Sequence, residues 1–539
     1  MVRLAPYNNL DIINILTPQD FNNFYAKYTV GYIDKSLPNK VLEPLFGQIP
    51  PSNTARCKCV IIENDYVDED FLEAYSRFYS KCFDNISQKS SRFHFFSKNI
   101  QLSDIYDLER LDDGKTYLGY SVFRPIKTCK ISRTVIKPSI TDRDKEFFIA
   151  RSSYQINLSG SKLSVEGIPF MEQDTNVAAC ASTALWISAI CMNKLFGEAM
   201  LSTSLITELA TKYDVSHGRS MPSPGLTSGQ MLEALRSMGY GPIYYMRPSS
   251  NEAKVTVYRY IESGIPVMVL FSHSSGHHAI TVVGHTYDHN IDPSPHHSIN
   301  LRGAQINFLL NTEWIPEFYI HDDQRGPYRK LKFLDITNYI LPNGHLDSNR
   351  FPMPRGCERK EDINCPVSVD GATGNIIGLV IPLPKEITLR AEHAQWVAEG
   401  LTCIAKGCFG MPDFDDVVIR TYLTRSNRYK ERIKNVERMA DSLKIIYRAK
   451  PMPKYIWVSE ISKKDWMKKG GAEERLMCGE IIMDCTSSLM NESFIYVHVP
   501  GYLIKMNPDD SLGREAFSRP PTRIVNDQPY PHFSRVNVD

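Results

Sequence analysis

The chain has 539 residues, several times the length of a typical domain, so we expect two or three domains that each bury a core. Its 62 lysines and arginines almost balance its 61 aspartates and glutamates, which removes any bulk electrostatic reason to expect nucleic acid or an acidic membrane surface as a partner. Polar residues and Pro6 interrupt the N-terminal sequence where a signal peptide needs an apolar run, and no later stretch approaches the roughly 20 apolar residues of a membrane span. A cytoplasmic protein without a membrane partner is expected.

The cysteines have no pattern typical of a disulfide scaffold or a zinc site. There are 12 of them in the chain, without a CxxC motif. The pairs Cys403/Cys408 and Cys478/Cys485 have spacings that do not suit zinc knuckles, so we expect reduced, mostly buried thiols. No metal or other cofactor is predicted.

Residues 1–164 are predicted to form an N-terminal α/β domain of unknown role. Apolar runs predict strands at 57–63, 117–123 and 146–158. Between the first two, aromatic residues at i, i+4, i+7 and i+8 predict a helix at 68–83.

Residues 165–345 are predicted to form an α+β domain, with helices first and the sheet second. The segment 177–192 is apolar or small almost throughout, as a central buried helix requires, and Asp174, Thr175 and Asn176 are all competent N-caps before it. Further elements are expected as helices at 202–213, 228–238 and 252–262 and as strands at 267–271, 279–283 and 317–321.

Residues 346–372 are polar and proline-bearing and are predicted to be a linker. A C-terminal α/β domain of unknown role is expected at 373–539. Its predicted elements are helices at 391–405 and 425–443 and strands at 376–381, 455–458, 480–484 and 494–499. We expect the charged helix at 425–443 to present a solvated face, and no chemical motif is found in this domain.

One cysteine occupies a place that favours a reactive thiolate. Cys180 comes near the start of the predicted buried helix, where the helix dipole stabilises an anion, and its neighbours are small. A thiol nucleophile also needs a histidine base, which the sequence GHHAITVVGH at 276–285 supplies. The strand FYIHDD then ends in Asp322 and Asp323, and either carboxylate could orient the histidine.

These residues resemble the papain-like cysteine peptidases, and the strand ESGIPVMVLF looks like that of their C39-like branch. The resemblance covers about residues 165–345. In this family the base begins a strand as His-Ala with a glycine six residues later, which His278 and Gly284 match and His277 does not. The resemblance implies that Cys180 is the nucleophile and His278 the base.

The resemblance also implies that Asp322 orients His278, with Asp323 as the alternative. The family's oxyanion glutamine lies six residues before the cysteine, where this chain has Asp174, whereas Gln173 lies seven before. Either Gln173 still faces the substrate oxygen or backbone amides take that role.

The resulting prediction is a cysteine-dependent acyl-transfer hydrolase, a peptidase or isopeptidase, that acts on a protein or peptide substrate through a thioester. A transpeptidase or deamidase would use the same residues, and a catalytically inactive papain-like binding module is the alternative outside enzymes. Metal binding is a further alternative, because eight histidines fall within residues 273–321. They are His273, His277, His278, His285, His289, His296, His297 and His321. The sequence does not predict the oligomeric state.

Overall fold

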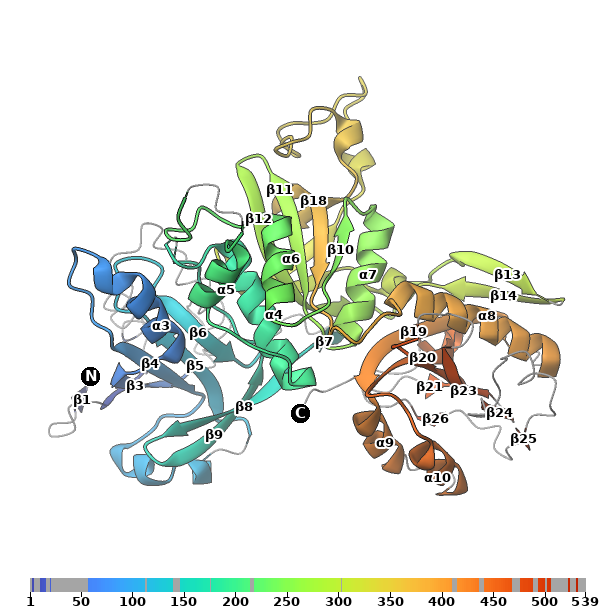
Figure 1. Cartoon of the computed structure of the whole chain (residues 1–539), viewed down its shortest axis with the longest axis horizontal. Helices are drawn as coiled ribbons and strands as arrows, with labels where there is room; N and C mark the ends of the chain where they lie inside the picture. Colours follow the sequence, from blue (N-terminus) through green and yellow to red (C-terminus); the bar gives the residue numbers. More distant parts are fainter. Residues whose placement is uncertain are drawn as a thin grey trace.

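The structure is a computed structural model with a mixed α/β fold (Figure 1). It describes residues 2–3, 10–15, 20, 57–111, 114–138, 146–174, 176–213, 218–301, 303–409, 414–435, 441–467, 476–487, 493–499, 502–505, 522–523 and 530–531. Within this part of the chain, no helix is long and apolar enough to cross a membrane.

An antiparallel six-stranded sheet forms the N-terminal part, with its strands in chain order. These are β1 Val2–Arg3, β2 Leu10–Asn14, β3 Cys59–Tyr66, β4 Ser90–Phe96, β5 Tyr117–Phe123 and β6 Ile131–Ile136. The helical segments here are α3 Glu69–Arg77, η1 Tyr79–Lys81, η2 Leu102–Asp107 and η3 Glu109–Leu111. The helix predicted at 68–83 is therefore shorter, and Asp68 caps α3 by accepting from the amide of Phe71.

The single strand predicted at 146–158 is wrong, because the chain turns there and forms two strands in different sheets. β7 (Glu146–Ile149) pairs with a strand of the central part, whereas β8 (Ser152–Leu158) forms a hairpin with β9 (Ser161–Gly167). This hairpin packs on the N-terminal sheet through β5 and β6. The segment therefore connects the first two parts of the molecule.

The predicted central helices are present, and the first of them is buried along its length. They are α4 Cys180–Phe196, α5 Thr203–Ala210, α6 Ser228–Ser237 and α7 Ser250–Glu262. α4 ends at Gly197, whose φ of 70° is a left-handed conformation that glycine adopts without strain. It packs against the central sheet on one side and α5 and α6 on the other, which explains why its sequence is apolar all round.

Six antiparallel strands of the central part close into a ring. They are β11 Val267–His273, β12 Gly276–Tyr287, β15 Phe318–Asp322, β16 Gly326–Phe333, β17 Pro366–Val369 and β18 Ala372–Ile381. β17 pairs with both β16 and β18, and β18 returns to β11, which completes the ring. The short strand β10 (Ile243–Met246) extends the sheet beside β18, and the 3-10 helices η5 Ile336–Tyr339 and η6 Lys360–Asp362 precede β17.

The domain boundaries expected at residues 345 and 372 do not coincide with the boundaries of the sheets. The predicted linker contains β17, and β18, expected to open the C-terminal domain, lies between β10 and β11 instead. β17 and β18 form a local hairpin, but their other partners, β16 for β17 and β10 and β11 for β18, lie farther away along the chain. A sheet pairing of this kind has no local signature.

A second eight-stranded sheet forms the C-terminal part and recruits a hairpin from the middle of the chain. Its strands are β13 His297–Leu301, β14 Ala304–Leu309, β19 Asp416–Arg425, β20 Tyr455–Lys463, β22 Gly479–Asp484, β23 Phe494–Val499, β24 Tyr502–Lys505 and β25 Thr522–Arg523. β14 pairs in parallel with β19, so the hairpin β13–β14, which follows β12 in the chain, belongs to this second sheet. β21 Leu476–Met477 and β26 Tyr530–Pro531 form a separate pair.

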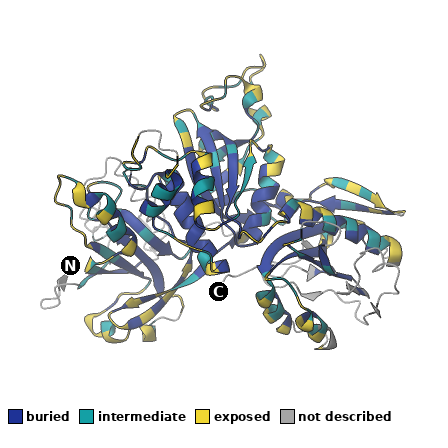
Figure 2. Cartoon of the chain, viewed as in Figure 1, coloured by how far each residue is buried: buried dark blue, intermediate teal, exposed yellow. Residues whose placement is uncertain are grey.

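Helix α8 (Ala391–Phe409) lies across this second sheet, and α9 (Ser426–Lys434) and α10 (Asp441–Ala449) lie at its other side (Figure 1). The single helix predicted at 425–443 is therefore wrong in its extent, since α10 continues to Ala449; residues 436–440 lie outside the described part. α11 (Lys464–Met467) and η4 (Asn311–Trp314) are short. Most of the described strands in the three larger sheets are buried, whereas β13 is half-buried or exposed (Figure 2).

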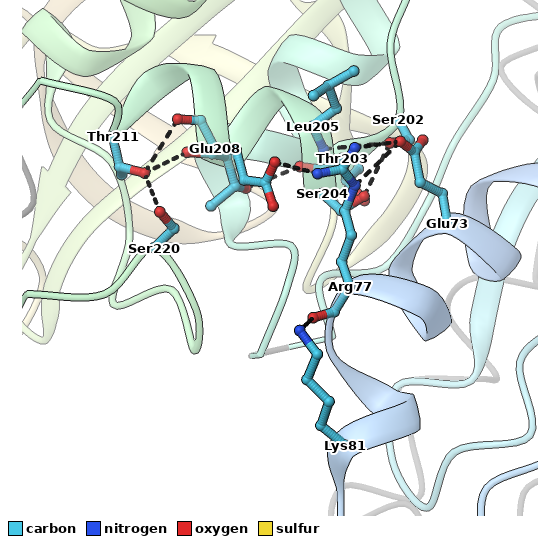
Figure 3. Close-up of polar contacts among 11 residues, drawn as sticks. Glu73, Arg77, Lys81, Ser202, Thr203, Ser204, Leu205, Glu208, Thr211 and Ser220 are labelled. Carbon is cyan, nitrogen blue, oxygen red and sulfur yellow. Dashed lines mark hydrogen bonds and ion pairs between the residues drawn. The ribbon is translucent and has the colours of Figure 1, made fainter.

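Polar contacts between α3 and α5 join the N-terminal part to the central helices (Figure 3). Arg77 on α3 forms ion pairs with Glu73 one turn earlier, at 3.0 Å, and with Glu208 on α5. Next to these pairs, Ser202 caps α5 by accepting from the amide of Leu205 at 3.3 Å. This contact keeps α3 against the helices that surround α4.

Candidate active site

Cys180 is the first residue of α4, as the sequence indicates. Its N-cap is Ala179, with φ −87° and ψ 171°, and no side chain caps the helix. The amides of the first turn therefore lack intrahelical partners and, with the helix dipole, favour an anion at this end. Cys180 is half-buried, whereas the helix residues that follow it are almost all buried.

The predicted capping role of the residues before α4 is wrong for Asp174 and Asn176, and Thr175 lies outside the described part. Asp174 instead holds the preceding loop, because its Oδ1 accepts from the amides of Asn176, Val177 and Ala178 at 2.7–3.0 Å. Its Oδ2 accepts from the hydroxyl of Tyr79 at 2.9 Å. The tendency of aspartate to bind amides a few residues later is the signal that could have indicated this role.

His278 enters the site from β12 and is buried. Its Nε2 lies 3.0 Å from Oδ1 of Asp322 at the end of β15, because β12 and β15 are neighbours in the ring. The ring of Phe271 on β11 packs edge-on against the imidazole at 5.6 Å. The other ring nitrogen, Nδ1, has no hydrogen-bond partner among the described residues.

The thiol of Cys180 lies close enough to the imidazole to influence its charge. Burial by itself lowers the pKa of His278, but the hydrogen bond to Asp322 and the interactions with Cys180 and Asp323 outweigh it and hold the pKa well above its ordinary value. The thiol contributes to the raised pKa as a hydrogen-bonding partner of the imidazole, and Nδ1 has no closer partner among the described residues. The structure thus brings Cys180, His278 and Asp322 together from α4, β12 and β15.

The two adjacent aspartates have different environments. Burial raises the pKa of Asp322, but this is outweighed by His278 and by Arg325, which donates to Oδ2 at 2.8 Å, so its pKa lies well below the usual range. Asp323 lies 3.4 Å from His278 Nε2, and both its oxygens lack a hydrogen-bond partner in the described structure. Burial, together with the charge of Asp322, raises the pKa of Asp323 to about 7.

Gln173 is half-buried, so its side chain is partly accessible to solvent. The neighbouring Asp174 is engaged by the loop and by Tyr79, so its carboxylate is not available to a substrate. Of Gln173 and Asp174, Gln173 therefore offers the available side-chain donor. Its role as a donor to the substrate oxyanion stays a prediction.

Three histidines of this part of the sequence have separate partners. His285 pairs with Glu262 at 2.7 Å, His297 pairs with Glu399 at 3.1 Å, and His321 lies 3.2 Å from a backbone oxygen. Among the described residues, one group has the spacing of a metal site, formed by His278 with Asp322 and Asp323, whose ligand atoms lie within 4.8 Å of one another.

A scan against models of known protein families and a search of curated proteins found no match to this chain.

Proposed function

We propose that the chain is a cysteine-dependent acyl-transfer hydrolase, a peptidase or isopeptidase, that acts on a protein or peptide. The observation that carries this proposal is the buried His278–Asp322 pair beside the thiol at the start of α4. A histidine whose Nε2 is held by a carboxylate and whose Nδ1 has no partner is arranged to serve a nucleophile. The raised pKa of His278 favours an imidazolium, which stabilises a thiolate.

In the proposed reaction, His278 Nδ1 takes the proton of the Cys180 thiol, and the sulfur attacks the substrate carbonyl. Cleavage of the C–N bond releases an amine that receives this proton, and the acyl group remains on sulfur as a thioester. His278 then deprotonates a water molecule, which attacks the thioester and releases the acid and the thiol. Amides of the first turn of α4 and Gln173 are the proposed donors to the carbonyl oxygen.

We further propose that the central part is a papain-like domain of the C39-like branch. The support is a nucleophile helix, α4, packed against an antiparallel ring of strands that carries the histidine and the aspartate. The cytoplasmic location and the class of substrate stay predictions. A transpeptidase or deamidase would share the acylation step and differ in the acceptor or in the leaving group.

The metal alternative uses the same His278, Asp322 and Asp323, so it competes with the acyl-transfer proposal. Arg325 disfavours a cation there, because its guanidinium already occupies Oδ2 of Asp322 at 2.8 Å. Elemental analysis of purified protein that finds a stoichiometric transition metal would favour this alternative.

An electrophilic cysteine probe tests the proposal. We expect a limiting amount of iodoacetamide at pH 6 to label Cys180 first, and His278→Ala to remove this preference, with the labelled peptides identified by mass spectrometry. Cys191, buried in the same helix, and Cys408, exposed on α8, serve as internal references in every sample. Equal labelling of Cys180 in both proteins, or none in either, would contradict the proposal.

The substrate is then sought with Cys180→Ala, which keeps the binding surface and removes the nucleophile. Proteins retained by this variant are compared with those retained by His278→Ala. A partner retained by both and cleaved only by the native chain is the expected result.

A further inference from the structure

A cavity of about 270 Å³ lies at the N-terminal sheet. It is bounded by the start of β4 and by the segment that follows β5. This volume is several times the roughly 30 Å³ that a water molecule occupies in the liquid, so a small organic molecule fits. The proposed catalytic residues do not line it.

The charged groups of this cavity are all positive. Lys89, Arg124 and Lys130 line it, and among the described residues no aspartate or glutamate does. Lys89 has only a distant, exposed contact with Asp65, at 3.8 Å, and a pair of that kind contributes little. Cations that converge on one cavity raise the local concentration of an anion.

Two buried polar groups at this cavity have no hydrogen-bond partner. They are the hydroxyl of Ser90 and Nε of Arg124, whose residues are 2% and 4% exposed. An unsatisfied buried donor costs about 1–3 kcal/mol, which a ligand that reached these atoms would relieve. The apolar part of the wall includes Phe93 and Phe123, whose rings lie 4.3 Å apart.

We propose that this cavity binds a small organic phosphate, with the phosphate held by Lys89, Arg124 and Lys130 and the carbon part against Phe93 and Phe123. A dianionic phosphate offers three acceptor oxygens to the convergent donors, whereas a carboxylate offers two and a single charge. The hydroxyl of Ser90 is a further donor at the edge of the cavity.

The same arginine reaches the segment before the nucleophile, so the bound phosphate acts on the proposed active site. Arg124 donates to the backbone oxygen of Glu172 at 3.0 Å, and its guanidinium lies 3.7 Å from Asp174. Asp174 in turn holds the amides of the loop that ends at Cys180. This regulatory part rests on the proposed function, whereas binding of the phosphate does not.

Isothermal titration calorimetry of the full chain tests the binding, with glycerol 3-phosphate as the probe and glycerol and acetate at matched ionic strength as comparisons. We expect one site for the phosphate ester and none for the other two. The double variant Lys89→Gln/Lys130→Gln should bind at least about tenfold more weakly. Lys127→Gln, which removes the same charge from an exposed lysine outside the cavity, should differ from the native chain by less than about twofold.

Binding of equal strength in the double variant, or no binding of glycerol 3-phosphate at millimolar concentration, would overturn the proposal. Circular dichroism shows whether the double variant is folded. If the double variant is not folded, Ser90→Ala is measured in its place. We expect this variant to bind glycerol 3-phosphate about threefold to tenfold more weakly, and an unchanged affinity would count against the site.

The coupling is measured separately as the rate at which iodoacetamide labels Cys180 with and without saturating glycerol 3-phosphate. A changed rate in the native chain that is absent in the double variant supports the coupling, and an unchanged rate overturns it. If Cys180 is never labelled preferentially, the proposed function fails while the calorimetric result stands.

Discussion

At the scale of single residues, the two neighbouring carboxylates at His278 have opposite protonation tendencies. Asp322 is held charged by His278 and Arg325, whereas Asp323 has no hydrogen-bonding partner for either oxygen among the described residues. A charged carboxylate orients the imidazole and stabilises its protonated form, and a neutral acid does not. The geometry therefore assigns the orienting role to Asp322.

We expect Asp322→Asn to raise the midpoint of the pH profile for alkylation of Cys180 by about 1–2 units, because the imidazolium that stabilises the thiolate loses its counter-ion. Asp323→Asn is the matched control, one residue away, with a smaller shift expected. The measurement is the rate of iodoacetamide labelling between pH 4 and pH 9. A larger effect of Asp323→Asn would reverse the assignment.

Asp323 also gives a stability prediction with a defined sign. Its pKa is raised to about 7 in the folded state, so the folded chain binds this proton more tightly than the unfolded chain does. Its contribution to stability is therefore full below the unfolded pKa near 4 and is lost as the pH rises to 7. We expect Asp323→Asn, which resembles the protonated acid, to be more stable than the native chain at pH 8 by about 2–4 kcal/mol, with a smaller difference at pH 5.

Urea denaturation at the two pH values measures this difference. A variant that is less stable than the native chain at pH 8 would show that Asp323 is stabilised as an anion. The sequence could locate the two aspartates at the end of a strand, but their different charge states depend on burial and on Arg325, which only the folded arrangement shows.

At the scale of elements, Gly284 shows why the strand that carries His278 needs a glycine. β7 pairs with β12 at this point, and a Cβ on Gly284 would lie 2.2 Å from the backbone oxygen of Phe148. The nearest atom belongs to the backbone of β7, so it cannot move aside as the end of a flexible side chain would. Gly284, the glycine of the His-Ala pattern, thus permits β12 to pair with β7 in addition to β11 and β15.

We expect Gly284→Ala to lower the free energy of unfolding by about 1–3 kcal/mol or more, because the added methyl group forces β7 away from β12. Gly400→Ala in α8 is the control, since a Cβ there meets no atom within 4 Å. That substitution should be neutral or stabilise the chain by up to about 1 kcal/mol. Equal denaturation midpoints for the two variants would contradict the close contact.

Most helices and strands of the central part could be predicted from the sequence, because each has a local periodic pattern. The hairpin β11–β12 and the helix α7 are examples. Partners of strands could not be predicted: β14 joins β19 across more than a hundred residues, and the two-residue turn between β7 and β8 leaves no clear break in the apolar pattern. Local patterns indicate elements and leave their neighbours undetermined.

At the scale of the whole molecule, a buried ionic group joins the ring to the C-terminal sheet. Arg420 on β19 pairs with Glu262 at the end of α7 and with Glu460 on β20, the latter at 2.8 Å. Glu262 also accepts from His285 on β12, the strand that begins with the catalytic candidate His278. All of these side chains are buried.

We expect Arg420→Met to destabilise the chain by about 3–5 kcal/mol, because it leaves two buried carboxylates without their cation. The triple variant Glu262→Gln/Arg420→Met/Glu460→Gln should recover much of this loss, since no charge then remains unpaired. Differential scanning calorimetry measures both. If Arg420→Met is as stable as the native chain, the ion pairs of Arg420 contribute little to stability.

The ring of strands sets a minimum length for a chain that carries the candidate site. A polypeptide that ends at residue 345 contains Cys180, His278 and Asp322, yet it lacks β17 and β18 and so leaves the edges of β11 and β16 unpaired. Exposed edges of this kind pair with other chains and lead to aggregation. During synthesis the site would therefore remain open to such contacts until Ile381 has left the ribosome, and expression of the central part alone requires the chain to continue through that residue.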